Sequence, residues 1–344
     1  MKVGDDIVHY ALIGYGAWGR FHARAITQAP NSELIVIYSR SQEKRSAAKE
    51  DYGVDVMADY HEVLSRDDVD VVDIVVPNHL HREFAVAALD AGKHVLLEKP
   101  MAVTVDECDE ILAAAQRSGK VLAIGFELRT SALWGQVHQL IADGKIGEPL
   151  YGVIDLWRRP YRLGSAGWRF DPQRVGSWIL EEPIHFFDLA RWYMSDVGEP
   201  QWVFARAKAS NPATPELHDN FAAMLAFPND AFVTITHTLC AHEHHQTVKL
   251  TGTKGAIWAW WSGEMDRTEH PEYGLLYFDG KVQHELPVEK TPGEIFELVE
   301  EITAMSRAVL TGEPPPATGE DGKWAVKMCY SAEQSARTGQ IVRL

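Results

Sequence analysis

The sequence predicts an α/β chain of two domains: an N-terminal doubly wound parallel sheet, then an α+β domain made largely of antiparallel strands. Three observations support this. The 344 residues exceed what one ordinary core holds. Strand-like and helix-like segments alternate up to residue 126, as in parallel sheets with crossover helices. Beyond it, long segments of period 2 dominate, which is typical of antiparallel strands. We therefore expect domains at 1–126 and 127–344.

The N-terminal elements follow from apolar runs and their breakers. Short runs rich in Val, Ile and Leu predict buried strands, and longer amphipathic stretches ending near Pro or Gly predict helices. The expected strands are 7–13, 34–38, 71–76, 94–97 and 121–126. The expected helices are 17–28, 42–52, 84–91 and 105–118.

A glycine-rich loop joins the first strand to the first helix. It reads Gly14-Tyr15-Gly16-Ala17-Trp18-Gly19. In this setting Gly14 permits a tight turn, Gly16 lets a phosphate approach the backbone, and Gly19 lets the helix pack on the strand. The unpaired N–H groups of the helix then face the anion. A plain tight turn is the alternative, but the strand–loop–helix context favours a dinucleotide-binding Rossmann domain.

The end of the second strand bears on the cofactor. An acidic residue there would bind the ribose hydroxyls of NAD and repel the 2′-phosphate of NADP. The chain instead has Ser39 and Ser41, which can donate hydrogen bonds, and Arg40, which can pair with a phosphate. We therefore favour NADP, with NAD as the alternative.

The second domain begins with a helix over 133–142. Strands are then expected at 151–157, 202–209, 221–227, 232–239, 247–250 and 256–261, with a hairpin at residues 228–230. Trp202 and Phe204 share one face of their strand, as do Trp258 and Trp260. Such a face either packs against helices or is buried in another subunit.

Composition excludes several classes of protein. The formal net charge of −16 argues against nucleic acid and anionic lipid as partners. No apolar run is long enough to span a membrane, and the N-terminus lacks the features of a signal peptide. Three widely spaced cysteines form neither a disulfide framework nor a zinc site, so we expect a cytoplasmic protein.

Several motifs together resemble the Gfo/Idh/MocA oxidoreductases, named for glucose–fructose oxidoreductase and inositol dehydrogenase. They are the run from Ala91 to Glu98-Lys99-Pro100, the loop Pro77-Asn78-His79 with His81, the segment 251–255 and the tail from Asp321-Gly322 to Gly339. The resemblance covers nearly the whole chain. It implies a large, mostly antiparallel second sheet, NAD(P)-linked chemistry on a sugar, cyclitol or polyol, and a homodimer or homotetramer formed through that sheet. It also implies that Pro77, Asn78, His81, Glu98 and Lys99 lie at the cofactor.

The resemblance further implies catalytic roles for Lys99, Glu181 and His185. Related enzymes carry Asp-x-Gly-x-His where this chain has Glu181-Glu182-Pro183-Ile184-His185. If the segment is one helix, Glu181 and His185 share a face. A histidine with an ordinary pKa near 6.5 can take the substrate hydroxyl proton, and a lysine can stabilise the oxygen. The departures are a longer acid and a proline in place of glycine, which stiffens the turn.

Substrate contacts are expected from a basic stretch and its neighbours. Between residues 158 and 174 the chain has five arginines and one acid, which would suit an anionic substrate, a subunit contact or a stacking loop. The substrate-binding candidates are Arg158, Arg159, Tyr161, Trp168, Glu182 and His237. We predict no metal site, because His242, His244 and His245 lack recognisable cysteine or carboxylate partners at ligand spacing.

The leading function is an NAD(P)-dependent dehydrogenase or reductase of a sugar, cyclitol or polyol. A glycosidase that keeps NAD bound and cleaves through transient oxidation of the sugar is one alternative. A non-catalytic regulator that retains the nucleotide site is another, and the presence of both Lys99 and His185 argues against it.

Overall fold

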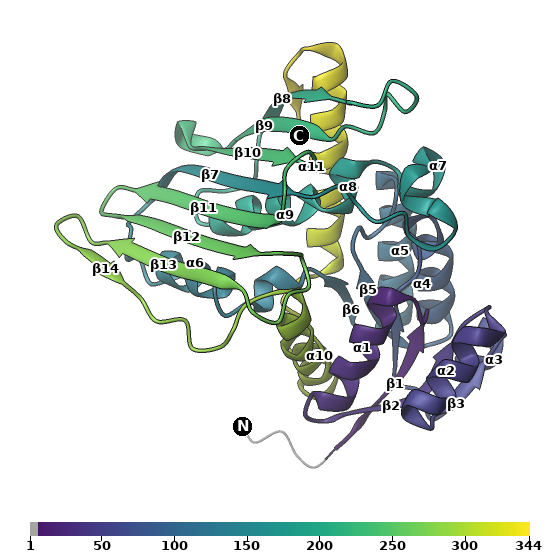
Figure 1. Ribbon diagram of the computed structural model, residues 1–344. Helices are drawn as coiled ribbons and strands as arrows, with labels where there is room; N and C mark the ends of the chain where they lie inside the picture. The colour runs from purple at the N-terminus through teal and green to yellow at the C-terminus, as the bar shows by residue number, and fades with distance from the viewer. Residues whose placement is uncertain (1–5) are drawn as a thin grey trace. The chain divides into compact units, whose positions relative to one another are not determined.

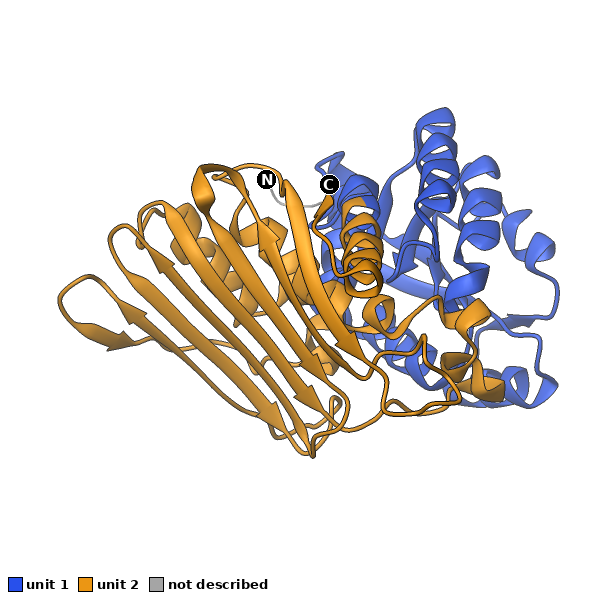
Figure 2. Cartoon of the chain, turned by 90° about the horizontal axis from the view of Figure 1, so that it is seen from above, with its two compact units in different colours: residues 1–127, 298–323 blue, residues 128–297, 324–344 orange. Residues whose placement is uncertain are grey.

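The computed structural model describes residues 6–344 (Figure 1). The chain divides into two units of dense internal contact. The first contains the chain up to Glu127 together with Leu298–Lys323, and the second contains Leu128–Glu297 and Trp324–Leu344 (Figure 2).

Six strands of the described first unit form a parallel sheet in the order β3-β2-β1-β4-β5-β6. The order reverses between β1 and β4, which is where doubly wound folds bind nucleotides. The strands are β1 Val8–Ile13, β2 Ser32–Tyr38, β3 Asp55–Met57, β4 Val71–Ile74, β5 His94–Glu98 and β6 Leu122–Gly125. The helices between them are α1 Ala17–Gln28, α2 Gln42–Tyr52, α3 Tyr60–Leu64, the short 3₁₀ helix η1 Asn78–Leu80, α4 His81–Asp90 and α5 Val105–Ser118.

Capping residues explain why the first and last residues of α2 and α5 could be predicted from the sequence. The Ser41 and Thr104 side chains accept backbone hydrogen bonds at the starts of α2 and α5. Gly53 and Gly119 end the same helices in the left-handed conformation. By contrast, β3 and α3 are three and five residues long. They are too short to show a period, and the sequence analysis missed both.

A helix from the far end of the chain completes the first unit. Helix α10, Glu294–Thr311, places Leu298, Ile302 and Met305 in the same apolar core as Tyr10 of β1. The Tyr10 hydroxyl also hydrogen-bonds Ser306 Oγ at 2.8 Å. The single boundary predicted near residue 126 must therefore be amended, because residues 298–323 pack with the first unit.

Nine strands of the described second unit form one sheet, in the order β14-β13-β12-β11-β7-β10-β9-β8-β15. All pairings are antiparallel except that between β7 and β10. The strands are β7 Pro149–Arg158, β8 Trp202–Lys208, β9 Asn220–Ala226, β10 Phe232–Thr238, β11 His244–Gly252, β12 Ala256–Gly263, β13 Glu272–Phe278, β14 Gln283–Glu285 and β15 Val342–Arg343. The expected hairpin is present as the turn η4, Pro228–Asp230.

Helices cover one face of this sheet and leave the other open (Figure 2). The helical segments between β6 and β8 are η2 Glu127–Thr130, α6 Trp134–Ala142, η3 Ser165–Phe170, α7 Pro172–Val175, α8 Trp178–Glu181 and α9 Pro183–Tyr193. Helix α9 packs on β7 and β10, and α11, Gly319–Thr338, reaches the β8 edge, where Ser335 Oγ accepts from Ala205 N–H.

The open face carries the paired aromatic residues. Trp202, Phe204 and Trp260 are half-buried, while Trp258 is 46% exposed. The helix-covered face carries their neighbours in sequence instead, such as Val203 and Ala259. These aromatic residues therefore do not pack against the helices of their own unit, which was one of the two expected alternatives.

Within residues 6–344 we find no helix with the length and apolar character needed to cross a bilayer.

Candidate functional site

The glycine loop leaves open space where an anion would approach. Gly14 has φ +109°, and a side chain there would collide with the Val75 carbonyl. A side chain at Gly19 would collide with the Gly14 carbonyl, so both positions need glycine for packing. A Cβ at Gly16 would meet no atom within 4 Å. Because Gly16 caps α1 without a side-chain hydrogen bond, the loop fits a phosphate group.

Two arginines gather at the end of β2. Arg40 is exposed there, as predicted. Arg45 was not anticipated: it reaches back from α2 so that Nη1 donates to the carbonyls of Ser39 and Arg40 at 2.6 and 3.0 Å. The Ser41 hydroxyl accepts from Lys44 N–H at the start of α2, so only Ser39 of the two serines lacks a capping role. The strand end is therefore more basic than the local sequence indicates.

His81, expected at the cofactor, uses its side chain to join two loops. It is fully buried at the start of α4. Its ring nitrogens face the carbonyl oxygens of Val76 and Pro100, at 2.8 and 2.6 Å. His81 therefore joins the loop after β4, which carries Pro77 and Asn78, to the turn after β5.

A buried carboxylate links the glycine loop to Lys99. Glu98 Oε1 accepts a hydrogen bond from Trp18 Nε1 at 2.7 Å, and Oε2 accepts from the backbone N–H of Lys99 at 3.2 Å. The Trp18 side chain, expected at the cofactor, thus points to Glu98. Both residues belong to the first unit.

Glu98 also belongs to a buried row of charges that the sequence analysis missed. His22 Nε2 lies 2.9 Å from Glu98 Oε1, and His22 Nδ1 lies 2.8 Å from Asp73 Oδ2. Burial alone would lower the pKa of His22, but the Asp73 charge and the hydrogen bonds to both carboxylates raise it well above its usual value. A charged imidazolium between two acids therefore anchors the carboxylate that holds Lys99.

In the second unit, Glu181 and His185 do not share a helix. Helix α8 ends at Glu181, Glu182 has the non-helical angles φ −137° and ψ −41°, and α9 begins at Pro183. Proline lacks an N–H and disfavours a helical conformation in the residue before it, so it starts a new helix. The expectation of one shared face was therefore wrong. His185 is buried in the first turn of α9, and its backbone N–H donates to the Glu182 carbonyl.

The arginine stretch is paired with three acids, one of which lies far away in sequence. Glu181 accepts from Arg169 Nε, and Glu182 pairs with Arg158. Asp266, in the loop after β12, is 3.2 Å from Arg158 Nη2 and 2.8 Å from Arg162 Nη2. Burial opposes ionisation of Asp266, but the charge of Arg158, followed by those of Arg267 and Arg162, lowers its pKa to about 2.

The paired charges balance. The ion pairs around this stretch join four arginines to four carboxylates: Arg158, Arg162, Arg169 and Arg267 with Glu181, Glu182, Asp266 and Glu294. Arg159, by contrast, is exposed, and its backbone N–H donates to the Glu243 carbonyl. The network leaves little net positive charge for an anionic substrate.

Aromatic rings and histidines line this network. Arg158 stacks 4.9 Å above Tyr161 and Arg169 stacks 4.8 Å above Trp168. His237 is buried beside Tyr161, and neither ring nitrogen has a hydrogen-bond partner among the described residues. Burial, and then the charge of Arg158, lowers the pKa of His237 to about 3. Its imidazole is therefore neutral at physiological pH, although it is polar and buried.

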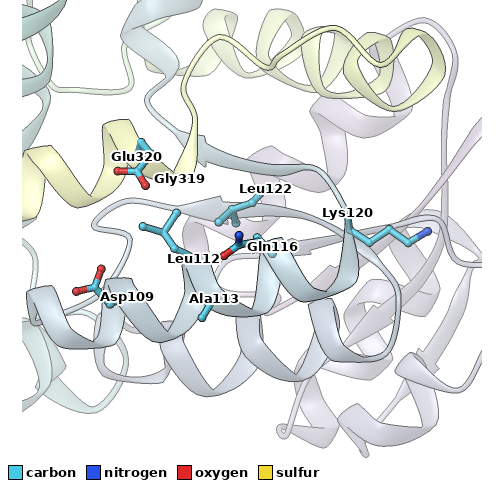
Figure 3. Close-up of a pocket in the computed structure, with 9 residues that line it drawn as sticks. Asp109, Leu112, Ala113, Gln116, Lys120, Leu122, Gly319 and Glu320 are labelled. Atoms are coloured by element: carbon cyan, nitrogen blue, oxygen red, sulfur yellow. The ribbon is translucent and has the colours of Figure 1, made fainter.

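A surface pocket of about 620 Å³ lies elsewhere in the first unit (Figure 3). It is formed by α5, the start of β6 and the start of α11, with Leu112, Gln116 and Glu320 among its lining residues. None of the predicted site residues lines it.

Comparison with known proteins extends this geometry. Residues 8–126 match the family model described as "Oxidoreductase family, NAD-binding Rossmann fold", and residues 134–258 match the "GFO/IDH/MocA C-terminal domain". A 1,5-anhydro-D-fructose reductase from Ensifer adhaerens is 27% identical over 97% of this chain and 98% of its own. A myo-inositol 2-dehydrogenase from Thermotoga maritima is 27% identical over 97% of each chain. An aldose–aldose oxidoreductase structure from Caulobacter crescentus, complexed with glycerol, is 26% identical with a TM-score of 0.85, and covers 98% of this chain and 100% of its own.

The fold and the glycine loop define an oxidoreductase with an NAD(P)-binding Rossmann domain. The chain belongs to the Gfo/Idh/MocA family.

Proposed function

We propose that the protein transfers a hydride between NAD(P) and a carbon atom of an uncharged sugar, cyclitol or related polyol. The observation that carries the proposal is the position of Glu98, which hydrogen-bonds both Trp18 of the glycine loop and the backbone of Lys99. A lysine suited to substrate chemistry is thereby tied to the nucleotide-binding loop. The similarity to a sugar reductase and an inositol dehydrogenase supports the substrate class.

Lys99 and His185 are the groups to which we assign proton handling. A bound nicotinamide supplies the hydride acceptor for oxidation and the donor for reduction. For oxidation of an alcohol, we assign uptake of the hydroxyl proton to a ring nitrogen of His185 and a stabilising hydrogen bond to the substrate to Lys99 Nζ, as the family resemblance implies. In the reverse direction His185 returns the proton. A positioned acid–base group of this kind contributes about 10²–10⁴ in rate.

Glu181 and Glu182 have a different part in this proposal. Because Arg169 binds Glu181 and Arg158 binds Glu182, each acid fixes an arginine rather than acting as a proton acceptor. The arginines in turn hold the rings of Trp168 and Tyr161. We infer that these two arginine–carboxylate pairs and the two rings that they hold shape the substrate-binding surface.

An uncharged substrate fits this surface better than an anion. Arg158, Arg162 and Arg169 already have carboxylate partners, which a substrate carboxylate or phosphate would have to displace. His237 offers neutral ring nitrogens that have no partner among the described residues, which suits a substrate hydroxyl. A hydroxyl can donate to one such nitrogen and accept from another group.

The test is a substrate panel followed by two variants. Aldoses, inositols and anhydro sugars are compared with the corresponding uronic acids and sugar phosphates, with NAD and NADP, by nicotinamide absorbance. We expect turnover of neutral compounds and a rise in KM for their acidic counterparts. Lys99→Ala and His185→Ala should each lose at least about 10²-fold in kcat.

The controls separate catalysis from folding. Lys281→Ala and His61→Ala remove an exposed lysine and an exposed histidine and should leave kcat unchanged. Cofactor binding and circular dichroism should be normal in all four variants. Near wild-type kcat in a folded Lys99→Ala or His185→Ala protein would refute that residue's role. Efficient turnover of acids alone would refute the neutral substrate.

A further inference from the structure

The loop between β10 and β11 brings two histidines and a glutamate together on the surface. The ligand atoms of His242, Glu243 and His245 all lie within 4.8 Å of one another. His245 Nε2 is 3.2 Å from Glu243 Oε2. The sequence predicted no metal site, but in the structure Glu243 supplies the carboxylate partner of two of the histidines. The third, His244, lies on the opposite face of the sheet, where it is buried near Glu182.

We propose that His242, Glu243 and His245 bind a divalent transition-metal ion of the zinc type at the start of β11. Two imidazoles and one carboxylate are a donor set that such ions accept, with water in the fourth position. Two ligand atoms at about 2.0–2.1 Å from a tetrahedral ion lie roughly 3.3 Å apart. The separation between His245 Nε2 and Glu243 Oε2 already matches this value.

One ring of the site is held in a binding orientation. His245 Nδ1 is 2.9 Å from Ser262 Oγ on the neighbouring strand β12, which leaves Nε2 directed toward Glu243. Ligating histidines in metalloproteins commonly use the second nitrogen in this way. Strand pairing fixes His245 between Trp157 of β7 and Ser262 of β12, so the sheet supplies a rigid support.

The loop conformation brings the other two ligands to this ring. Glu243 adopts φ +58°, in the left-handed region that glutamate rarely occupies. The Arg159 N–H binds the Glu243 carbonyl at 3.0 Å, and Ala241 N–H binds the Arg158 carbonyl at 3.2 Å. The His242 ring lies with its centroid 6.0 Å from that of His245. His242 is exposed, so its ring can turn toward the ion without disturbing the core.

The His242, Glu243 and His245 site contains none of the proposed catalytic residues. Its two imidazole ligands determine which kind of metal ion it binds. Imidazole nitrogen favours zinc, nickel and copper over magnesium and calcium, which prefer oxygen donors. A chain with a net charge of −16 also attracts cations in general, so selectivity among ions is what separates a built site from diffuse attraction.

The experiment measures Zn²⁺ binding to protein without a polyhistidine tag, by isothermal titration and by competition with a chromogenic chelator. We expect one equivalent bound in the micromolar range. The double variant His242→Ala/His245→Ala should lose at least tenfold in affinity. Ser262→Ala, which removes only the orienting hydroxyl, should weaken binding by about tenfold. Mg²⁺ and Ca²⁺ at a hundredfold excess should not compete.

Two matched controls exclude other ligands. His284→Ala removes an exposed histidine that pairs with Asp279 elsewhere on the same sheet. Cys240→Ser removes the exposed thiol two residues before His242. Neither should change the Zn²⁺ affinity. The proposal is overturned if the double variant binds zinc as the wild type does, if Cys240→Ser abolishes binding, or if Mg²⁺ competes equally. The measurement needs no turnover, so its result is independent of the proposed function.

Discussion

At the scale of single residues, the adenosine end of the cofactor gives the sharpest physical argument. A carboxylate that would exclude the 2′-phosphate is missing at Ser39, and two guanidinium groups, Arg40 and Arg45, lie at the strand end. A phosphate carries more charge than a ribose hydroxyl and accepts stronger hydrogen bonds from arginine. We therefore propose NADP as the preferred cofactor, with Arg40 as its direct ligand.

The cofactor prediction concerns two substitutions. Ser39→Asp adds an acceptor for the ribose hydroxyls and repels the 2′-phosphate, so both effects favour NAD. A charge-assisted hydrogen bond is worth roughly 1.5–3 kcal/mol, so the preference should move toward NAD by at least tenfold. Arg40→Ala should weaken NADPH binding and leave NADH binding nearly unchanged. Fluorescence titration with both reduced cofactors gives the dissociation constants.

Arg117→Ala is the matched control, because this exposed arginine pairs with Asp90 on neighbouring helices of the first unit. It should bind both cofactors as the wild type does. A wild type that prefers NAD, with an Arg40→Ala variant that keeps full NADPH affinity, would contradict the assignment.

Residues whose role follows from local chain geometry could be predicted from the sequence. Gly14 and Gly19 are required by contacts within the glycine loop and its adjoining strands, so their spacing alone identified them. Asp266 could not be found in this way, because its partner Arg158 is 108 positions away. His22 and Asp73 likewise acquire their roles only when α1 and β4 pack together.

At the scale of elements, α8 and α9 show how one residue type changes a site. A four-residue spacing predicts a shared helical face only while the helix continues, and Pro183 ends that continuity. The proline was visible in the sequence, and its effect on the turn was noted. The ion pair between Glu181 and Arg169 could not be predicted in this way, because it depends on how residues 159–177 fold back.

Helix α10 was missed although its apolar spacing is helical. It also carries a buried acid, Glu297, whose Oε1 accepts from Gly293 N–H at 3.1 Å and whose Oε2 has no partner among the described residues. Burial raises the pKa of Glu297 to about 7, above the ordinary value of 4.5. The folded protein therefore holds this proton more tightly than the unfolded chain does.

The stability prediction follows from the sign of that shift. Because the folded pKa is raised, the wild type loses stability as pH rises from about 4.5 to about 7, and the loss is complete above that range. Glu297→Gln removes the titration and keeps an oxygen acceptor. It should be close to neutral at pH 5 and stabilising at pH 8, by on the order of 3 kcal/mol.

Thermal unfolding of both proteins at a series of pH values checks this expectation. Glu313→Gln, at an exposed position after α10, is the control and should show no pH-dependent difference from the wild type. A Glu297→Gln variant that is less stable than the wild type at pH 8 would show that the ionised carboxylate makes a favourable contact.

At the scale of the whole molecule, the open face of the second sheet carries a group of exposed and half-buried aromatic residues. In addition to Trp202, Trp258 and Trp260, this face carries Trp157 and Tyr151 of β7, which are 54% and 37% exposed. Tyr151 also packs on Phe232. Aromatic residues are enriched at subunit interfaces, and soluble proteins seldom expose so many together. We propose that two copies of the chain associate through this face.

The assembly prediction is a change in oligomeric state. In a two-fold interface a single substitution acts twice, so Trp258→Glu should bury two uncompensated charges and shift the protein to monomers. Light scattering after size-exclusion chromatography gives the mass. Ile7→Glu, which adds the same charge at an exposed apolar position in the first unit, should leave the mass unchanged. A monomeric wild type at micromolar concentration would exclude the interface.

The return of α10 to the first unit has a consequence for synthesis of the chain on the ribosome. The unit that begins at the N-terminus lacks Leu298, Ile302 and Met305 of its core until the last part of the chain emerges. Translation of the intervening 170 residues, 128–297, takes on the order of ten to thirty seconds. During that interval the core surface that Tyr10 shares with these three side chains stays uncovered. The unit that is begun first is thus completed only after most of the second unit has been made.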